Sequence, residues 1–356
     1  MSVPAASKPT PGANGDSVVV EAPGRLHLGF LDPSGTLGRR FGSLGVTLGD
    51  FVTLVELAHA EKDAFVAGAD AEPAEIERLA RHVAAMRRLA GTDRPLRATL
   101  HRSLPVHAGF GSGTQLALAV GHAFAVLHGL ALSTESIALA LARGSRSGVG
   151  IRAFAQGGFL VDAGQGAGGT LPPVVSRFEF PDEWRVVLVF DDRLHGLHGG
   201  EESVEIGKLG AFPRSCAAEL CHQLLLAVLP GLAERDFAAF AAGLTQIQDA
   251  NGAHFAPAQG GTAYVSPAVA DVLSVLRARF AAAVGQSSWG PTGFGFLPSQ
   301  RTADDAVKVL RGSGSVPPHV RLVVARGRNR GARVFRRAGA GLVPAAPGDE
   351  PEARRS

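Results

Sequence analysis

Residues 109–114 read Gly-Phe-Gly-Ser-Gly-Thr and separate two segments of opposite character. Before them, residues 96–104 are typical of a strand that ends at Pro105; after them, residues 116–130 are almost wholly apolar and predict a helix buried on nearly every side. Three glycines let backbone N–H groups approach an anion closely, and the following helix aims its unpaired N–H groups at the same point. The loop therefore predicts a phosphate site, with a tight turn before a buried helix as the simpler alternative.

This loop matches neither of the two common nucleotide-binding motifs. No lysine follows Gly113, which excludes a Walker A loop. Gln115 and Leu116 stand where a dinucleotide-binding fingerprint needs its third glycine. The expected ligand is consequently an anion outside these two classes of nucleotide site.

Upstream of the loop, residues 17–30 are typical of a strand that contains Arg25 and His27. Residues two apart on a strand project from the same face, so these two side chains are candidates to line one site. A histidine on a half-buried strand is also commonly just hydrogen-bonded in place, and the residues alone leave both possibilities open. A hairpin-like turn at 32–35, β-type alternation over 45–57 and a helix over 72–89 follow.

Downstream of the apolar helix, a second helix over 133–143 ends in a glycine-rich, basic loop. Arg143, Arg146 and Arg152 surround Ser147-Gly148-Val149-Gly150, and guanidinium groups bind phosphate through fixed, charge-assisted forks. This pattern suits a ligand with more than one phosphate. A solvated basic turn is the alternative.

The second half of the chain predicts a small α+β layer, and the domain boundary is expected near residues 180–183. A length of 356 residues also favours two domains. The expected elements are strands over 184–190, 293–297 and 320–326, the last of these being the final strand, and helices over 216–229, 236–248, 269–283 and 303–310.

Three polar loops accompany these elements. The loop over 286–293 contains Ser287, Ser288 and Trp289 and is suited to close over a planar ring or a phosphate. The cluster over 246–251 is interpreted as a capped helix end. The loop over 195–202 carries His195 and His198 three residues apart, and its glycines do not fix their geometry, so zinc is not expected there.

Composition indicates a globular protein, with 46% hydrophobic and 19% charged residues. Residues 1–16 and 344–356 are expected to be disordered tails. Cys216 and Cys221 form neither a CxxC pair nor a zinc site and are expected to be reduced in a cytoplasmic protein. No apolar signal region opens the chain and no run approaches the ~18 uninterrupted apolar residues of a membrane span, so a soluble protein is expected.

Arginines concentrate late in the chain, between residues 326 and 337. Such a cluster suits a solvated strand edge, a phosphate-facing surface or nucleic acid. No nucleic-acid recognition motif accompanies it, so nucleic acid is not an expected partner.

Three segments resemble, in order, the three motifs of the GHMP small-molecule kinase superfamily: residues 22–25, 105–113 and 287–295. The resemblance covers about residues 17–340. It implies an α+β fold of two domains, with an N-terminal half over 17–182 like ribosomal protein S5 domain 2 and a ferredoxin-like C-terminal half over 183–343.

The carboxylates of the superfamily's kinases are missing at the corresponding positions. Those kinases commonly carry a catalytic Asp about seven residues before a Gly-Gly pair and a magnesium-binding Glu about eight before the Ser-Gly. Counting back from the glycine pair at 157–158 reaches Gly150, and counting back from Ser147 reaches Leu139. Neither side chain accepts a proton or binds a metal, which argues against a kinase and against ATP as a ligand.

Within the superfamily the chain resembles more closely the β-ribofuranosylaminobenzene 5'-phosphate synthase family. The segments that carry this resemblance are residues 25–32, 109–115, 146–150 and 157–162. The family implies that phosphoribosyl pyrophosphate and 4-aminobenzoate give a C-riboside phosphate, carbon dioxide and pyrophosphate. It also implies magnesium, with ligands that the sequence does not identify, and a homodimer.

The predicted site follows from these loops and this chemistry. Its members are Arg25, His27 and His198 as catalytic candidates, Gly109, Gly111, Ser112, Gly113, Thr114, Arg143, Arg146, Ser147 and Arg152 for phosphate and pyrophosphate, and Ser287, Ser288 and Trp289 for the aromatic ring or a closing loop. A base is plausible, and the sequence does not choose between His27 and His198. A GHMP-type kinase of a small alcohol and a non-catalytic ligand- or RNA-binding protein remain as alternatives.

Overall fold

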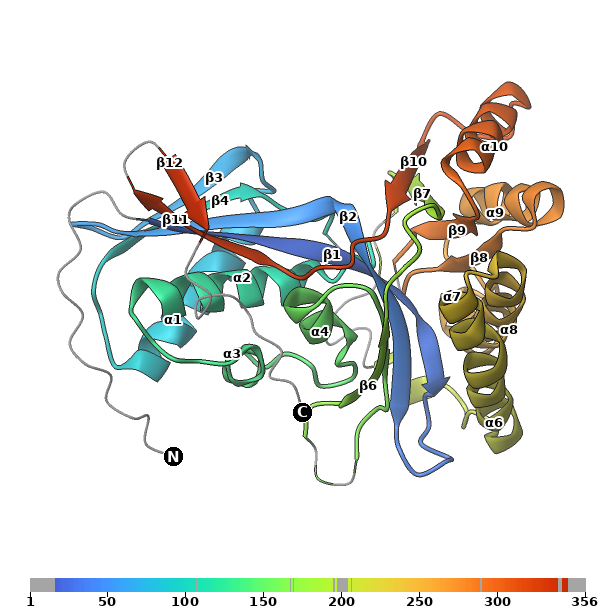
Figure 1. Ribbon diagram of the computed structural model, residues 1–356, viewed down its shortest axis with the longest axis horizontal. Coiled ribbons are helices and arrows are strands. Elements are labelled where there is room, and N and C mark those ends of the chain that lie inside the picture. The colour runs from blue at the N-terminus through green and yellow to red at the C-terminus, as the bar shows by residue number, and fades with distance from the viewer. Residues whose placement is uncertain are drawn as a thin grey trace.

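The computed structural model describes residues 17–344 except 107, 167, 169, 195, 197–203, 206, 289 and 339–340. It has the expected α+β architecture, in which a large sheet and a smaller sheet are each covered by helices (Figure 1). The elements are β1 Ser17–Asp32, β2 Phe41–His59, β3 Ala64–Asp70, α1 Glu75–Ala90, β4 Leu96–Arg102, α2 Ser112–Leu127, α3 Thr134–Ala140, α4 Val149–Ala155, β5 Phe159–Asp162, β6 Val174–Phe178, β7 Arg185–Asp191, α6 Arg214–Gln223, η1 Leu224–Val228, α7 Leu229–Glu234, α8 Phe237–Phe255, η2 Ala256–Gln259, α9 Pro267–Phe280, β8 Ala283–Gln286, β9 Gly293–Leu297, α10 Gln300–Gly312, β10 Val320–Arg326, β11 Arg333–Ala338 and β12 Gly341–Pro344.

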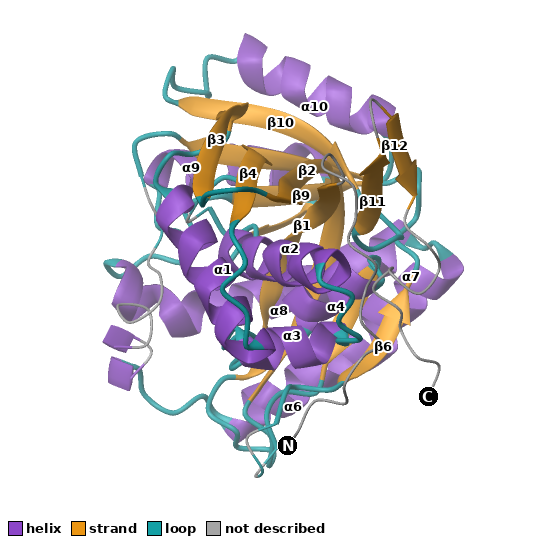
Figure 2. Ribbon diagram, turned by 90° about the vertical axis from the view of Figure 1, so that its left-hand side faces the viewer, coloured by secondary structure: helices purple, strands orange, loops and turns teal. Residues whose placement is uncertain are grey.

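The large sheet is built around the long antiparallel hairpin β1–β2. Its order is β12-β11-β1-β2-β4-β3, and β5 and β6 extend it from β2. The register of β1 against β2 shifts twice, between Pro23 and Arg25 and between His27 and Phe30. Figure 2 shows α1, α2 and α3 together on one face of this sheet. Helix α2 is buried along nearly its whole length, as its apolar sequence predicts.

The small sheet has the order β10-β7-β9-β8 and is antiparallel throughout. Strand β7 is buried on both faces: Val187 and Val189 pack with α9 and α10, whereas Val186 and Leu188 belong to the core that contains α8 and part of β1. This alternation follows from the two-residue repeat of a strand. It joins the two halves of the molecule through one hydrophobic core.

The strand over 320–326 is not the last one, which corrects the sequence-based expectation. After β10 the chain returns to the large sheet, where β11 pairs with β1 and places Val334 opposite Val20. Residues 333–338 therefore lie in the first sheet and not in the second. The exact domain limits, 17–182 and 183–343, otherwise stay a prediction.

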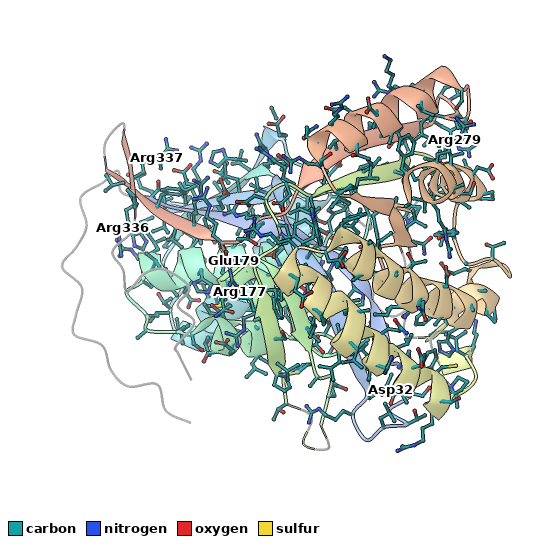
Figure 3. All side chains as sticks on the ribbon, turned by 45° about the vertical axis from the view of Figure 1, so that its right-hand side comes forward. Asp32, Arg177, Glu179, Arg279, Arg336 and Arg337 are labelled. Atoms are coloured by element: carbon teal, nitrogen blue, oxygen red, sulfur yellow. The ribbon has the colours of Figure 1, made fainter. Side chains whose placement is uncertain are left out.

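The late arginines lie in and around this return segment, and Arg326, Arg328, Arg333 and Arg337 have carboxylate partners. Arg328 and Arg333 contact Glu21 at 2.8 and 2.7 Å, and burial, which raises the pKa of Glu21, is outweighed by these hydrogen bonds, which lower it. Figure 3 shows Arg336 and Arg337 on β11, at the opposite end of the molecule from Arg279 of α9. Because β11 pairs with β1 on one side and with β12 on the other, Arg333, Arg336 and Arg337 lie on an inner strand, which corrects the strand-edge interpretation.

Two local expectations differ from the structure. Residues 149–155 form helix α4, although the glycines at 144–150 predict a break through residue 150. Helix α9 ends at Phe280 and β8 follows, because Ala281 adopts a left-handed φ of 49° that closes the helix.

The helical stretch Arg214–Glu234 is by length and composition apolar enough to cross a membrane, with a hydropathy of 1.5 and 33% of that window buried. Core helices of globular proteins pass the same test, so this single helix is weak evidence for a span. Its inward residues, including Leu220, Leu224 and Val228, pack in the core with α8. Cys216 and Cys221 on this stretch are free, as predicted.

Candidate active site

The glycine loop folds against strand β1. Gly109 and Gly111 adopt left-handed φ angles of 81° and 74°, which favour glycine. The Arg25 Nη1 donates to the Gly109 carbonyl at 2.7 Å, and a Cβ on Gly111 would lie 3.1 Å from the Arg25 Cζ. Helix α2 starts at Ser112 with no acidic residue in its first turn and no side-chain cap. Its positive end is therefore available to an anion.

A cavity of about 620 Å³ opens beside this loop, and four arginines line it. We call it the arginine cavity; its lining includes residues 109, 111–114, Arg25 of β1, Arg78 and Arg81 of α1, and Arg143 after α3. Among the described residues that line it there is no Asp or Glu. The glycine loop, for which a tight turn was the simpler interpretation, therefore also forms one wall of a cavity lined by arginines.

Helix α1 contributes cations that the sequence interpretation missed. Arg78, Arg81 and His82 lie within one helical turn of one another and all face the arginine cavity. Their spacing of three and four residues places them on one side of a helix, which is a signal that the sequence did contain. That they face the glycine loop, about 30 residues away, follows from tertiary packing alone.

Burial and the neighbouring arginines keep His82 neutral, and the arginines also repel one another. Burial lowers the pKa of His82 to about 4, with further lowering by Arg143, Arg81 and Arg78. Burial also lowers the pKa of Arg143, and Arg78 and Arg81 lower it further. Arg78 forms an ion pair with Glu75 at 3.1 Å. Such convergence of positive charge is suited to a ligand with several negative charges.

His27 is buried and neutral. Its Nδ1 accepts a hydrogen bond from the Gly29 N–H at 3.3 Å, which puts the ring proton on Nε2. Burial lowers the pKa of His27 to about 3, and the charges of Arg25 and Arg146 lower it further. The Nε2 has no hydrogen-bond partner among the described residues. The ring is accordingly better placed to donate a hydrogen bond than to take up a proton.

A second cavity, of about 320 Å³, lies next to His27. We call it the aromatic cavity, since Phe30, Phe255 and Tyr264 contribute rings to its lining. Ser288 lines both cavities and adopts a left-handed φ of 55°. The two cavities therefore share a wall at the loop after β8.

Ser287 fastens that loop to both the glycine loop and β1. Its buried Oγ donates to the Gly109 carbonyl at 2.8 Å and accepts from the His27 backbone N–H at 3.1 Å. A Cβ on Gly109 would lie 2.3 Å from the Ser287 carbonyl oxygen. Ser287 thus ties the loop after β8 to the glycine loop and to β1, two residues from the first motif, while Trp289 lies outside the described residues.

Not every predicted phosphate ligand reaches the arginine cavity. Arg152 forms an ion pair with Glu135 at 3.7 Å and does not line the cavity. The Ser147 hydroxyl forms hydrogen bonds with Asp162 and Ser43, at 3.0 and 2.6 Å, so it holds its loop against β5 and β2. Arg146 lies close enough to His27 for its charge to lower that pKa. His198 and the rest of the histidine loop at 197–202 fall outside the described residues.

The polar cluster over 246–251 is not a helix end, which corrects that interpretation. It lies inside α8, where the Asn251 side chain exchanges two hydrogen bonds of 2.9 Å with the backbone of Phe30. The Gln248 amide donates to the Leu28 carbonyl at 2.7 Å. A strand that shifts register beside a buried helix needs such partners for its free backbone groups. Both amides also line the aromatic cavity.

The expected kinase positions carry no acidic group in the fold. Gly150 lies beside the start of α2: a Cβ there would be 3.3 Å from the Thr114 methyl, and its carbonyl accepts from Gln115 at 2.8 Å. Leu139 is 61% exposed. The glycine therefore stands close to the start of α2, where it offers neither a base nor a metal ligand.

Comparison with known proteins identifies the fold. Residues 76–158 match the family model of the GHMP kinases N terminal domain, and residues 228–316 match that of the GHMP kinases C terminal. Solved structures with the same fold include a homoserine kinase from Cytophaga hutchinsonii, with a TM-score of 0.64, 18% identity and coverage of 91% of this chain and 98% of that one. A mevalonate diphosphate decarboxylase from Staphylococcus aureus has a TM-score of 0.63, 16% identity and coverage of 90% and 98%.

Curated relatives cover nearly the whole chain. The β-ribofuranosylphenol 5'-phosphate synthase of Archaeoglobus fulgidus is 31% identical over 330 residues, which are 88% of this chain and 98% of the relative. The protein of the same name from Methanothermobacter thermautotrophicus is 29% identical over 332 residues, with the same coverage. With the fold and the arginine-lined glycine loop, these likenesses confirm the family that the sequence motifs implied. The chain belongs to the β-ribofuranosylphenol 5'-phosphate synthase family of enzymes, built on the GHMP kinase fold.

Proposed function

We propose that this protein transfers the phosphoribosyl group of phosphoribosyl pyrophosphate to a ring carbon of a 4-substituted benzoate, with release of pyrophosphate and carbon dioxide. One observation supports phosphoribosyl pyrophosphate as the donor substrate. Four arginines and the N-terminal end of α2 surround the arginine cavity, and no described carboxylate lines it. A diphosphate leaving group matches this charge. The family relatives are named for a ribofuranosylphenol 5'-phosphate, which is the product of such a transfer.

The reaction needs charge stabilisation at the leaving group. As the bond from the ribose anomeric carbon to the pyrophosphate oxygen breaks, the electron pair stays on the pyrophosphate and the sugar gains oxocarbenium character. Guanidinium and backbone N–H donors that are already in place stabilise this charge best where water is excluded. Arg143, Arg78 and the loop at 111–113 supply such donors.

The acceptor then needs no covalent partner from the protein. The ring carbon that bears the carboxylate forms the new carbon–carbon bond with the anomeric carbon. The bond from that ring carbon to the carboxylate next breaks, its electron pair restores the aromatic ring, and carbon dioxide leaves. A para substituent that donates electrons stabilises the intermediate, so the chemistry accepts either an amine or a hydroxyl group there.

The sequence resemblance and the name of the relatives differ in the para substituent of the acceptor. The sequence resemblance implies 4-aminobenzoate, whereas the name of the relatives specifies a phenol, for which 4-hydroxybenzoate is the matching acceptor. Both acceptors should be tested in the same assay with the same donor. The acceptor with the higher kcat/KM is then the preferred substrate.

Magnesium, which the resemblance implies, finds no carboxylate set here. Mg²⁺ in enzymes is usually held by one or two carboxylates together with substrate phosphates. In the part of the chain that the structure describes, no group of three His, Cys, Asp or Glu residues is suited to hold a metal ion. The described lining of the arginine cavity contains no Asp or Glu, and the steps above use no metal. Magnesium dependence stays a prediction that activity after chelation tests.

We also propose a homodimer in the cytoplasm that binds neither nucleic acid nor membranes. Leu225 and Leu226 are each 63% exposed on the outer side of the helical stretch 214–234, and such side chains suit an interface between two copies. The free thiols of Cys216 and Cys221 suit a reducing compartment. Analytical ultracentrifugation of the protein and of Leu225→Glu tests the dimer, and cell fractionation tests the compartment.

The test of the proposed function is direct. Purified protein is incubated with phosphoribosyl pyrophosphate and either acceptor, without ATP, and pyrophosphate, carbon dioxide and the riboside phosphate are measured. The proposal expects all three in equal amounts. Formation of ADP from ATP and a small alcohol, with no pyrophosphate from the donor, would instead establish the kinase alternative.

A further inference from the structure

We infer that the aromatic cavity is the subsite for the acceptor ring and that the acceptor reacts across Ser288 with a donor held in the arginine cavity. This inference rests on the proposed function, and it assigns a place in the fold to each substrate. It also gives roles to residues of the second half of the chain, on α8 and near α9, that none of the sequence motifs contains.

The two cavities differ in chemistry as the two substrates do. The aromatic cavity is lined by three aromatic rings, several alanines and glycines, and side-chain amides. Its two charged lining residues, Asp249 and Arg277, bind each other through two hydrogen bonds of 2.9 and 2.8 Å, so together they add no net charge. An apolar cavity of about 320 Å³ with a few polar groups fits a small planar ring, and it does not fit a diphosphate.

The geometry places the two subsites side by side at the reacting bond. Ser288 lines both cavities, and Arg25 and His27, two residues apart on β1, each line one of them. The register shifts of β1 on either side of this pair interrupt its regular pairing with β2. Ser288 also holds a backbone conformation that non-glycine residues rarely adopt, and such strain concentrates at ligand sites. Attack by the ring carbon on the anomeric carbon requires this proximity.

His27 offers the hydrogen bond that would orient the ring. The side chain is 3% exposed and lines the aromatic cavity, and its Nε2–H has no acceptor among the described residues. A buried donor without an acceptor destabilises the free protein, so a ligand that supplies an oxygen there is favoured. The acceptor carboxylate is such a group, and it is attached to the ring carbon that must face the donor. His27 therefore holds the carboxylate end of the ring toward Ser288.

The experiment separates the two subsites by their effects on KM. Ala263 lines the aromatic cavity, whereas Ala258 of η2 does not, so Ala263→Leu narrows the cavity and Ala258→Leu is the matched control. Steady-state kinetics with each acceptor and with phosphoribosyl pyrophosphate are measured for both variants and for Arg81→Ala. We expect Ala263→Leu to raise the acceptor KM at least 10-fold with little change for the donor, Arg81→Ala to do the reverse, and Ala258→Leu to do neither.

Two further variants keep the test decisive if Ala263→Leu folds poorly. Phe255→Ala removes one ring of the cavity and should raise the acceptor KM at least 10-fold. His27→Asn retains an N–H donor and should keep more acceptor affinity than His27→Leu, with donor affinity equal in the two. A merely structural role for His27 would lower stability in both without this ordering.

The outcomes are distinguishable. If the parent protein forms no riboside phosphate with either acceptor, the proposed function itself fails. If the parent is active and Ala263→Leu or Phe255→Ala raises the donor KM, or neither KM, then the ring binds elsewhere and the assignment of the aromatic cavity is wrong. Acceptor-specific loss in these variants, with the opposite pattern in Arg81→Ala, supports it.

Discussion

Replacement of Arg143 by Gln should weaken donor binding without weakening the fold. Arg143 lines the arginine cavity beside the glycine loop, and a Cβ on Gly113 would lie 3.6 Å from its Nη1. Its guanidinium is partly buried near Arg78 and Arg81, and its Nε has no hydrogen-bond partner among the described residues. In the free protein the Arg143 guanidinium is therefore repelled by those of Arg78 and Arg81, and a bound anion reduces this repulsion.

The expected magnitudes follow from this arrangement. A lost hydrogen bond between charged groups costs about 1.5–3 kcal/mol. This corresponds to a decrease of roughly 10- to 150-fold in affinity for phosphoribosyl pyrophosphate. Removal of the charge also reduces repulsion among the arginines, so the melting temperature should stay the same or rise by roughly 1–2 °C, the shift that ~1 kcal/mol gives in a protein of this size.

Titration calorimetry with phosphoribosyl pyrophosphate and with inorganic pyrophosphate measures the first effect, and thermal unfolding without ligand measures the second. Arg88→Gln is the matched control, because Arg88 lies on α1, is exposed and does not line the cavity. Unchanged donor affinity in Arg143→Gln would place the diphosphate elsewhere. A melting temperature lower by more than about 5 °C would show that Arg143 supports the fold, against the reasoning from repulsion.

Three further predictions concern the glycine loop, the histidines and ATP. Gly111→Val should lower turnover at least about 100-fold, or roughly 2.7 kcal/mol, because the added side chain meets Arg25 and obstructs the anion. The melting temperature of this variant should fall as well, because φ at residue 111 is 74°. Intact turnover would show that the loop is only a turn. Burial lowers the pKa values of His82 and His122 from 6.5 to about 4, so as the pH falls these histidines become protonated in the unfolded chain before they do in the folded protein. Their contribution to the unfolding free energy is therefore complete above pH 6.5 and is lost as the pH falls toward 4. The loss amounts to up to about 1.4 kcal/mol per pH unit for each histidine. Urea unfolding at pH 7, 6 and 5 measures this loss, and His122→Gln should reduce the slope; stability that rises toward pH 5 would contradict it. Calorimetry with ATP and magnesium should detect no tight binding, because Gly150 and Leu139 stand at the kinase carboxylate positions, and ADP formation with a simple alcohol would reverse this conclusion.

Local features of this protein were predictable from the sequence because they depend on neighbours along the chain. The glycines at 109, 111 and 113, the apolar helix after them and the alternation of β1 are all short-range patterns, and each corresponds to the element that the structure contains. The family follows from the same short motifs. The residues at the expected kinase carboxylate positions are also readable, because they need only a count of residues from the glycine pair at 157–158 and from Ser147.

Only the tertiary structure decided which side chains share a site. Arg78 and Arg81 lie on a helix with no motif, and they join the glycine loop only because α1 packs beside α2 under the large sheet. Asn251, more than 200 residues after Phe30, satisfies the backbone of that residue where β1 leaves regular pairing. Arg152, next to the basic loop at 144–150 in sequence, pairs instead with Glu135. Sequence spacing sets the direction of a side chain within its own element, whereas its partners depend on how distant elements pack, and that packing is determined by the burial of the whole core.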